Sequence, residues 1–345
     1  MDFSNLLVQW YIQNKRDLPW RNTQNPYHIW LSEIMLQQTR VAQGMPYFLS
    51  FTAAFPTVFD LAKADEEQVL KLWQGLGYYS RARNLHKAAQ YVAFQCNGVF
   101  PKSYIELLKL KGIGEYTAAA IASFSYNEAV PVVDGNVFRV LARYFNIETD
   151  IAAASAKKEF AALAFELMPK DNPAVFNQAI MEFGALQCVP KNPNCEICPM
   201  NQSCLALQKK SVHLLPVKSK KLKVKNRFFN YLIIEDEENK TIVQKRLGKG
   251  IWENLYEFPL IETESAVDLD AIILPVKEFF EFEIHSIQEM KSNNQVHKLS
   301  HQHLHIKFWK VKIKGAAGGG IDYETLKTYP FPIVIYNFIE NDFLN

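Results

Sequence analysis

The sequence predicts a multidomain protein in which an all-α domain is followed by an α+β domain. Its length of 345 residues corresponds to about two domains of ordinary size. From Ser4 to about Leu207, apolar residues recur at helical spacing between repeated helix-start signals. Further along, the pattern changes to runs of branched and aromatic residues, which are typical of strands. We therefore predict a helical domain over residues 1–208, a linker over 209–226 and a second domain over 227–345.

Composition and charge exclude several classes of protein. With 48% hydrophobic, 13% aromatic and 21% charged residues, the chain is neither disordered nor collagen-like nor a charged coiled coil. No apolar run approaches the roughly 18 residues of a membrane span, and the segment Met1–Trp10 lacks the features of an export signal. We expect a cytoplasmic monomer with no membrane partner. The net charge of +2 gives no global reason to expect a polyanionic partner.

Helix-start signals mark the elements of the first domain in order. Asn25-Pro26 opens one helix as its cap and first-turn proline. Acidic residues at 65–67 open another, and a capping box over Ser103–Glu106 opens a third. Asp134 is the expected N-cap of a helix over residues 137–145. Nearly all of the first domain is therefore expected to be helical.

Two glycines separate the third of these helices from a predicted helix at about 115–123. The segment Gly112–Gly114 allows a tight turn, after which the amino-terminal amides of the next helix point outward. The backbone of Gly112 and Gly114 is therefore a candidate contact for DNA phosphate that does not read sequence. Taken alone, a Gly-x-Gly pair between helices is often only a turn.

Four of the five cysteines are concentrated in one loop. Cys188, Cys195, Cys198 and Cys204 have the spacing Cys-x6-Cys-x2-Cys-x5-Cys, whereas Cys96 stands far away. Prolines in the loop prevent it from continuing as a helix. Four thiolates suit either a structural zinc ion or an iron–sulfur cluster. Because zinc sites favour two Cys-x2-Cys pairs and this loop has one, we expect a 4Fe–4S cluster. We interpret Cys96 as a small buried residue.

A basic linker leads into the second domain. Eight Lys or Arg residues and no acid occur from Lys209 to Arg227, with Pro216 among them. Such a composition is typical of a linker and provides local positive charge that the near-neutral total conceals. The strands predicted beyond it are Phe228–Ile234, Thr241–Gln244 and Leu304–Ile313.

The hairpin is followed by the cysteine loop in the order found in helix-hairpin-helix DNA glycosylases of the endonuclease III superfamily, which carry a 4Fe–4S cluster. The helical domain resembles this superfamily. Within it, several motifs resemble the adenine DNA glycosylases of the MutY type. The matching segments are Leu18-Pro19-Trp20-Arg21, Trp30–Thr39, Gly75–Leu85 and Val133–Val137. The resemblance implies a six-helix module at about 25–125 and a cluster module formed by residues 1–24 and 126–208.

Glu33 and Asp134 are the candidate catalytic carboxyl groups. Glu33 lies in an otherwise apolar helix, where loss of hydration raises a carboxyl pKa and keeps a proton near neutral pH. Taken alone, an exposed helix glutamate is the simpler interpretation. The resemblance implies that Glu33 protonates N7 of adenine. It also implies that Asp134 stabilises the cationic sugar of an oxocarbenium-like transition state, by its charge or by transient covalent attachment.

The residue after the hairpin separates two branches of the superfamily. Relatives that also cut the strand place a lysine there to form a Schiff base. This sequence has Tyr116, so we predict a monofunctional glycosylase that leaves an abasic site. The resemblance implies that Tyr116 and Asn136 assist the two carboxyl groups.

The base must leave the duplex before its glycosidic bond is cleaved. The resemblance implies which residues take part in this step. Gln38 and Tyr78 are expected to wedge into the stack, while Tyr79 packs inward. Arg21 and Gln178 are expected to contact the edge of the adenine, for which glutamine offers both a donor and an acceptor.

The second domain resembles the Nudix-like domain of adenine glycosylases, most clearly over Gly250–Pro259. The Arg-Glu-x-x-Glu-Glu helix of the hydrolases is missing, so we predict a binding domain. The family's Phe-Ser-His loop, which recognises 8-oxoguanine, corresponds here to Leu299-Ser300-His301 without the aromatic ring. We expect Ser300 to bond the altered guanine. The alternating His301, His303 and His305 suggest either a metal site or, more simply, an exposed strand face.

The resemblance implies a base-excision repair enzyme that removes adenine opposite 8-oxoguanine or guanine in double-stranded DNA, in the nucleoid if the source is bacterial. Two alternatives stay open. One is another cluster-bearing mismatch glycosylase, for example one acting on thymine opposite guanine. The other is a non-catalytic binder of damaged DNA.

Overall fold

The computed structural model describes residues 2–219, 224–280, 282–290 and 296–343. They form two compact units. The first comprises Met1–Lys63 and Asn84–Lys220, and the second comprises Ala64–Arg83 and Lys221–Asn345. Residues 64–83, which the sequence groups with the helical domain, therefore share a compact unit with the C-terminal residues. The predicted domain boundaries stay predictions, and residues 220–223 of the predicted linker lie outside the described residues.

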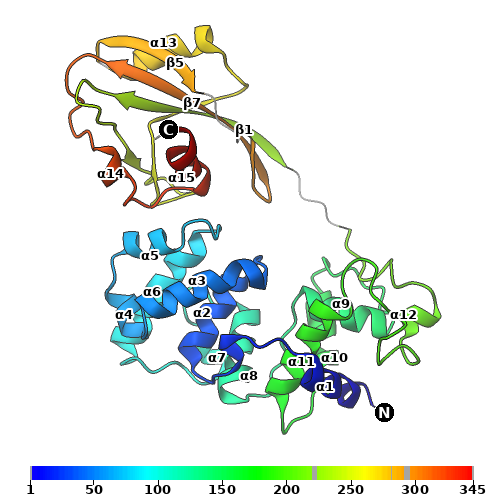
Figure 1. Cartoon of the computed structure of the whole chain (residues 1–345). Helices are drawn as coiled ribbons and strands as arrows, with labels where there is room; N and C mark the ends of the chain where they lie inside the picture. Colours follow the sequence, from blue (N-terminus) through cyan, green and yellow to red (C-terminus); the bar gives the residue numbers. More distant parts are fainter. Residues whose placement is uncertain (1, 220–223, 281, 291–295, 344–345) are drawn as a thin grey trace. The chain divides into compact units, whose positions relative to one another are not determined.

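The first unit is helical, as predicted (Figure 1). Its elements are α1 (Phe3–Asn14), the 3-10 turn η1 (Pro19–Arg21), α2 (Pro26–Leu36), α3 (Val41–Ala54), α4 (Val58–Lys63), most of α6 (Ser80–Gln95), α7 (Tyr104–Leu107), α8 (Glu115–Tyr126), α9 (Gly135–Tyr144), α10 (Ala156–Leu167), α11 (Pro173–Leu186) and α12 (Leu205–Gln208). No described helix is long and apolar enough to cross a membrane.

The predicted helix starts are confirmed by their caps. The Asn25 side chain accepts a hydrogen bond from the backbone N of Tyr27 at 3.0 Å. Ser103 Oγ accepts from the backbone N of Glu106 at 3.3 Å, although the helix that it opens has only four residues. Such caps satisfy amide groups that the first turn leaves without partners.

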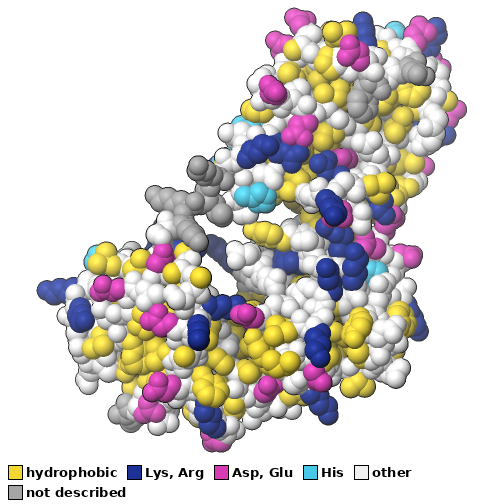
Figure 2. Space-filling view, turned by 180° about the vertical axis from the view of Figure 1, so that it is seen from behind, with side chains coloured by type: hydrophobic (Ala, Val, Ile, Leu, Met, Phe, Trp, Pro, Cys, Tyr) yellow, Lys and Arg dark blue, Asp and Glu magenta, His cyan; other side chains and the backbone are white. Residues whose placement is uncertain are grey.

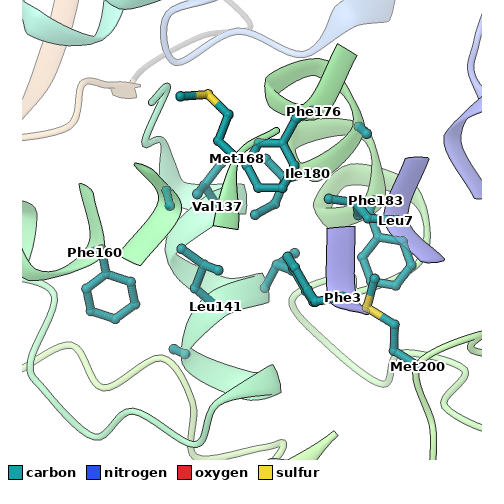
Figure 3. Packing of buried hydrophobic residues seen from close by; sticks show 14 of the residues in the cluster. Phe3, Leu7, Val137, Leu141, Phe160, Met168, Phe176, Ile180, Phe183 and Met200 are labelled. Carbon is teal, nitrogen blue, oxygen red and sulfur yellow. The ribbon is translucent and has the colours of Figure 1, made fainter. Parts of the chain in front are cut away.

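Two packed regions position the site in this unit. In one, α1, α9, α10 and α11 enclose a hydrophobic cluster in which Leu141, Phe160, Phe176 and Ile180 pack together (Figure 3). In the other, α2 is enclosed so completely that every residue from Ile29 to Met35 is buried. A helix that is buried on all sides carries any polar residue of its middle turns into the interior.

The second unit contains α5 (Glu66–Leu72) and a mixed sheet. The strands are β1 (Lys225–Glu235), β2 (Gln244–Lys245), β3 (Tyr256–Glu257), β4 (Leu260–Thr263), β5 (Ile284–Met290), β6 (Val296–Lys298) and β7 (Gln302–Ile313). The main sheet has the order β4-β1-β7-β5, with β6 also on β7. β1 is parallel to β7, and the other pairs are antiparallel. The remaining helices are α13 (Leu269–Phe279), α14 (Tyr323–Leu326), α15 (Ile333–Phe338) and the π-helix η2 (Ile339–Phe343).

Helices cover both faces of this sheet (Figure 1). Leu232 and Trp309 belong to one buried cluster with Ile272 of α13. The neighbouring residue Phe308 points to the other face and stacks on Phe338 of α15, with the ring centroids 3.7 Å apart. Because side chains alternate along a strand, the central strands are apolar on both faces. The prediction of an α+β domain is confirmed.

One predicted strand is largely absent. Over Thr241–Gln244 the structure has only isolated bridges from Thr241 to Glu235 and to Ile321, and β2 begins at Gln244. Residues 242–243 belong to no strand, and a turn over residues 237–239 precedes the run.

Candidate active site and cluster loop

Residues from several elements of the first unit line one cavity of about 530 Å³. This volume suffices for a purine base. The predicted site residues Arg21, Glu33, Tyr116, Asp134, Asn136 and Gln178 all line it. They come from η1, α2, α8, the start of α9, and α11, so the fold brings together residues that are far apart in the sequence.

Glu33 projects from the buried helix α2, and 7% of it is exposed. The interpretation as an exposed helix glutamate is therefore wrong. Burial raises its pKa to about 7, the charge of Asp134 adds to this effect, and a hydrogen bond with Tyr116 and the charge of Arg21 oppose it. Near neutral pH the carboxyl group thus holds a proton that it can donate.

Asp134 caps α9, as predicted. Its Oδ1 accepts from the backbone N of Asn136 at 2.8 Å and of Val137 at 2.9 Å, and its Oδ2 accepts from Asn136 Nδ2 at 2.7 Å. Burial raises its pKa, and these hydrogen bonds oppose the rise. The carboxyl group is therefore fixed in direction at a helix N-terminus while it lines the cavity.

Tyr116 and Asn136 hold the two carboxyl groups in place. Burial raises the pKa of Tyr116 well above its ordinary value, so its hydroxyl stays protonated as a partner for Glu33. Asn136 accepts from Arg139 Nη2 at 2.8 Å while it donates to Asp134. A Cβ atom at Gly184 would lie 2.6 Å from the Asn136 Cβ, so α11 approaches α9 this closely only with glycine there.

Arg21 and Gln178 lie on the wall of the cavity, and both are already held by neighbours. The Tyr11 hydroxyl donates to Gln178 Oε1 at 2.5 Å. Arg21 Nη2 donates to Glu182 Oε2 at 2.6 Å. The carboxylate of Glu182 also binds Arg16.

Glu182, Arg16 and Arg139 line the cavity but are absent from the sequence prediction. Glu182 follows apolar residues in α11 and precedes Phe183, which is the same pattern that singled out Glu33. That pattern was therefore available as a signal for Glu182. The two arginines had no comparable local signal.

The two expected wedge residues have unusual backbones. Gln38 has φ +57° and Tyr78 has φ +48°, both in the left-handed region that residues other than glycine rarely adopt. Gln38 is exposed, and 49% of Tyr78 is exposed. Tyr79 is buried, as predicted. Each expected wedge residue thus sits on an exposed, sharply turned segment of its own unit.

The hairpin glycines differ in their surroundings. Gly112 has φ +78°, and a Cβ there would lie 2.6 Å from the Asn84 Cβ, so glycine is required. Gly114 is the N-cap of α8, and a Cβ there would meet nothing within 4 Å. The open space at Gly114 allows a ligand to approach the amides that begin α8.

The four cysteines of the loop line one pocket together with Arg143. All of the described cysteines are free thiols, and Cys96 is half-buried rather than buried. Arg143 Nη1 lies 3.5 Å from Cys188 Sγ and donates to the Val189 carbonyl at 2.8 Å. Its fixed positive charge suits a group whose ligands are thiolates.

Among the described residues, no three His, Cys, Asp or Glu side chains are grouped closely enough to hold one metal ion. Four thiols that line one pocket suit either a zinc ion or an iron–sulfur cluster.

The loop with Ser300 is a tight turn between β6 and β7. The backbone N of Leu299 donates to the Gln302 carbonyl at 2.8 Å, which leaves Ser300 exposed, 3.2 Å from His301 Nδ1. The exposed-face interpretation of the histidines fits His301. His303 and His305 are half-buried and alternate with the buried residues Leu304 and Ile306, so they lie on the more exposed face of β7, where His305 stacks with Phe228 at 4.7 Å.

Three segments of the chain match known families. Residues 31–166 match the HhH-GPD superfamily of base excision DNA repair proteins. Residues 188–204 match the iron–sulfur binding domain of endonuclease III. Residues 230–341 match the NUDIX domain. The fold class and the iron–sulfur site predicted from sequence are confirmed.

Similar proteins cover most of the chain. An adenine DNA glycosylase of Buchnera aphidicola subsp. Acyrthosiphon pisum is 36% identical over 88% of this chain and 85% of that protein. One from the subspecies Schizaphis graminum is 38% identical over 76% of each protein. The structure of a thermostable thymine-DNA glycosylase has a TM-score of 0.55 and 29% identity, covering 60% of this chain and 95% of that one.

Proposed function

This chain belongs to the adenine DNA glycosylase family, and we propose that it removes adenine paired with 8-oxoguanine or guanine in double-stranded DNA. The observation that carries the proposal is Glu33, a buried carboxyl group with a pKa of about 7 in a cavity that has room for a base. Asp134 and Tyr116 line the same cavity. An acid, a fixed carboxylate and a neutral hydroxyl around one pocket suit the cleavage of an N-glycosidic bond.

In the proposed reaction Glu33 donates its proton to N7 of the extruded adenine. The bond between C1′ and N9 then breaks, and its electron pair leaves with the base. Asp134 stabilises the positive charge that develops on the sugar, by its own charge or by transient bonding to C1′. Water then adds to C1′ and loses a proton, which leaves an abasic site. Tyr116 provides no amine, so no imine forms and the strand is not cut.

The remaining residues bind and orient DNA in this proposal. The amides near Gly112 and Gly114 contact phosphate, Gln38 and Tyr78 fill the gap in the stack, and Ser300 bonds the 8-oxoguanine. The cysteines Cys188, Cys195, Cys198 and Cys204 hold a 4Fe–4S cluster, which when bound pins the loop. We further propose that the enzyme works as a monomer in the cytoplasm, at the nucleoid if the source is bacterial.

A panel of duplexes tests the proposal. Adenine is placed opposite 8-oxoguanine, guanine, cytosine and thymine, and a further duplex carries thymine opposite guanine. Base release is measured under single-turnover conditions, without alkali, to separate it from strand cutting. We expect fastest release opposite 8-oxoguanine, slower release opposite guanine and no cut strand. Release of thymine but not adenine would identify another mismatch glycosylase, and binding without release would identify a damage sensor.

A further inference from the structure

Glu182 is a second buried glutamate in the cavity, and the proposed reaction does not use it. It lies on α11, its side chain has 0% exposure, and it lines the same cavity as Glu33 and Asp134. A buried carboxylate is tolerated only when it is paired and hydrogen-bonded. Its partners therefore define what it does.

Both partners of Glu182 are arginines of one short segment. Arg16 donates to Oε1 from its backbone N at 3.0 Å and from Nε at 2.8 Å, and to Oε2 from Nη2 at 2.6 Å. Arg21 Nη2 donates to the same Oε2 at 2.6 Å. Burial alone raises the pKa of Glu182, but the hydrogen bonds from the two arginines outweigh it and bring the pKa to about 2. The carboxylate is therefore ionised throughout the physiological range.

This arrangement fixes the guanidinium of Arg21. The side chain of Arg21 is 14% exposed, and its Nη1 also donates to the Arg16 carbonyl at 3.4 Å. A guanidinium carries five N–H donors in one rigid plane, so holding its two terminal nitrogens sets the direction of the others. Because Arg21 lines the cavity, Glu182 decides where a bound base meets these donors.

We propose that Glu182 is a positioning residue for base recognition, which holds Arg21 on the wall of the pocket and offsets one of the two positive charges of Arg16 and Arg21 near Glu33. The inference rests on the proposed function, because it takes the cavity to be the adenine pocket. Glu182 itself does not contact the reacting atoms. It acts through Arg21 and through its charge.

The charge of Glu182 matters because several groups act on Glu33 at once. The charged and titratable residues that line the cavity are Arg16, Arg21, Glu33, Arg40, Tyr116, Asp134, Arg139 and Glu182. Arg21 already lowers the pKa of Glu33 against the larger effect of burial. Without the Glu182 carboxylate, Arg16 and Arg21 lose their shared anion, and their uncompensated charges lower that pKa further. Glu33 then loses its proton at a lower pH.

Two substitutions distinguish the effect of the position of the Glu182 carboxylate from the effect of its charge. Glu182→Gln keeps the shape and removes the charge, whereas Glu182→Asp keeps the charge and shortens the reach. Glu257→Gln is the matched control, because Glu257 is also a buried glutamate held by an arginine, with Arg246 Nη1 2.8 Å from Oε1, but it lies in the second unit. Folding is checked by the thermal unfolding midpoint and by the visible absorbance of the cluster.

The readout is single-turnover release of adenine opposite 8-oxoguanine as a function of pH. We expect Glu182→Gln to slow release about a hundredfold and to move the decline of the rate to lower pH. Glu182→Asp should slow release by less and keep the wild-type pH dependence. Glu257→Gln should leave both unchanged. In a double-mutant cycle with Arg21→Met, the combined loss should be smaller than the product of the single losses.

Distinct outcomes separate the two claims. If the wild-type enzyme releases no adenine, the proposed function fails and this inference fails with it. If the wild-type enzyme is active but Glu182→Gln keeps its rate and pH dependence, only the inference is overturned. The inference is also overturned if the double variant of Glu182→Gln and Arg21→Met loses as much rate as the product of the two single losses. If Glu182→Gln does not fold, Glu182→Asp decides the question by its rate: a slower rate whose loss is less than multiplicative with that of Arg21→Met supports the inference, and a wild-type rate or a fully multiplicative loss overturns it.

Discussion

The cavity is lined by two buried glutamates whose pKa values are shifted in opposite directions. On α2, burial raises the pKa of Glu33 to about 7 against the opposing effects of Tyr116 and Arg21. On α11, Glu182 is also buried, but Arg16 and Arg21 bring its pKa to about 2. The same residue type thus holds a proton near neutral pH on one wall and is a permanent anion on the other. The comparison teaches that the partners within the pocket, and not burial alone, assign the role of a carboxyl group.

The largest effect is expected from removing the proton donor. Glu33→Gln keeps the shape of the side chain but cannot protonate N7, so we expect adenine release to slow by about 10⁴-fold. Single-turnover release opposite 8-oxoguanine measures this. Binding of a duplex that already contains an abasic site serves as the control and should be unchanged. A rate close to that of the wild type would remove Glu33 from the reaction.

A somewhat smaller loss is expected from the second carboxyl group. Asp134→Asn can still cap α9 but loses the negative charge that we propose stabilises the sugar, so we expect release to slow by about a thousandfold. Because the charge of Asp134 also raises the pKa of Glu33, the decline of the remaining rate should move to lower pH. Unchanged kinetics would show that Asp134 is only a helix cap.

Removing the charge of Glu33 or of Glu182 is expected to change the folding stability in opposite directions. The pKa of Glu33 is higher in the folded state than in the unfolded chain, so folding loses free energy as the pH rises from about 4.5 to 7. Glu33→Gln should therefore stabilise the protein by up to about 3 kcal/mol at pH 8 and have little effect at pH 4. Glu182→Gln should destabilise it at pH 8, since its low pKa contributes stability above about pH 4.5. Chemical denaturation at both pH values measures the free energy of unfolding. A change of the same sign at pH 8 for both variants would contradict the comparison.

The smallest effect is expected from the hydrogen bond to Glu33. The Tyr116 hydroxyl lowers the pKa of Glu33 against the effect of burial. Tyr116→Phe should therefore move the decline of the rate to higher pH, with a change of about tenfold or less in the maximal rate. The pH profile of this variant measures the shift. A shift to lower pH would mean that Tyr116 supports the protonated form of Glu33 instead.

Local signals in the sequence were sufficient for much of the fold. The caps at Asn25 and Ser103 are formed by neighbouring residues, so they could be predicted without tertiary information. The strand predicted from Thr241 failed, because a four-residue run does not specify whether a partner strand is available.

The candidate site was less accessible to such reasoning. The burial of Glu33 depends on α3 and α8 packing around α2, which no local pattern reveals. The role of Glu182 depends on arginines that are more than 160 positions away in the sequence. The left-handed backbones of Gln38 and Tyr78 have no signal either, because neither residue is one that favours positive φ.

The most direct test of the account is the pH dependence of adenine release by the unmodified protein. The rate of release opposite 8-oxoguanine is measured under single-turnover conditions from pH 5 to pH 9. If Glu33 is the proton donor, the rate falls as the pH rises through about 7, because the carboxyl group then loses its proton. A rate that stays constant or rises across this range, or the absence of adenine release at every pH, would contradict the account.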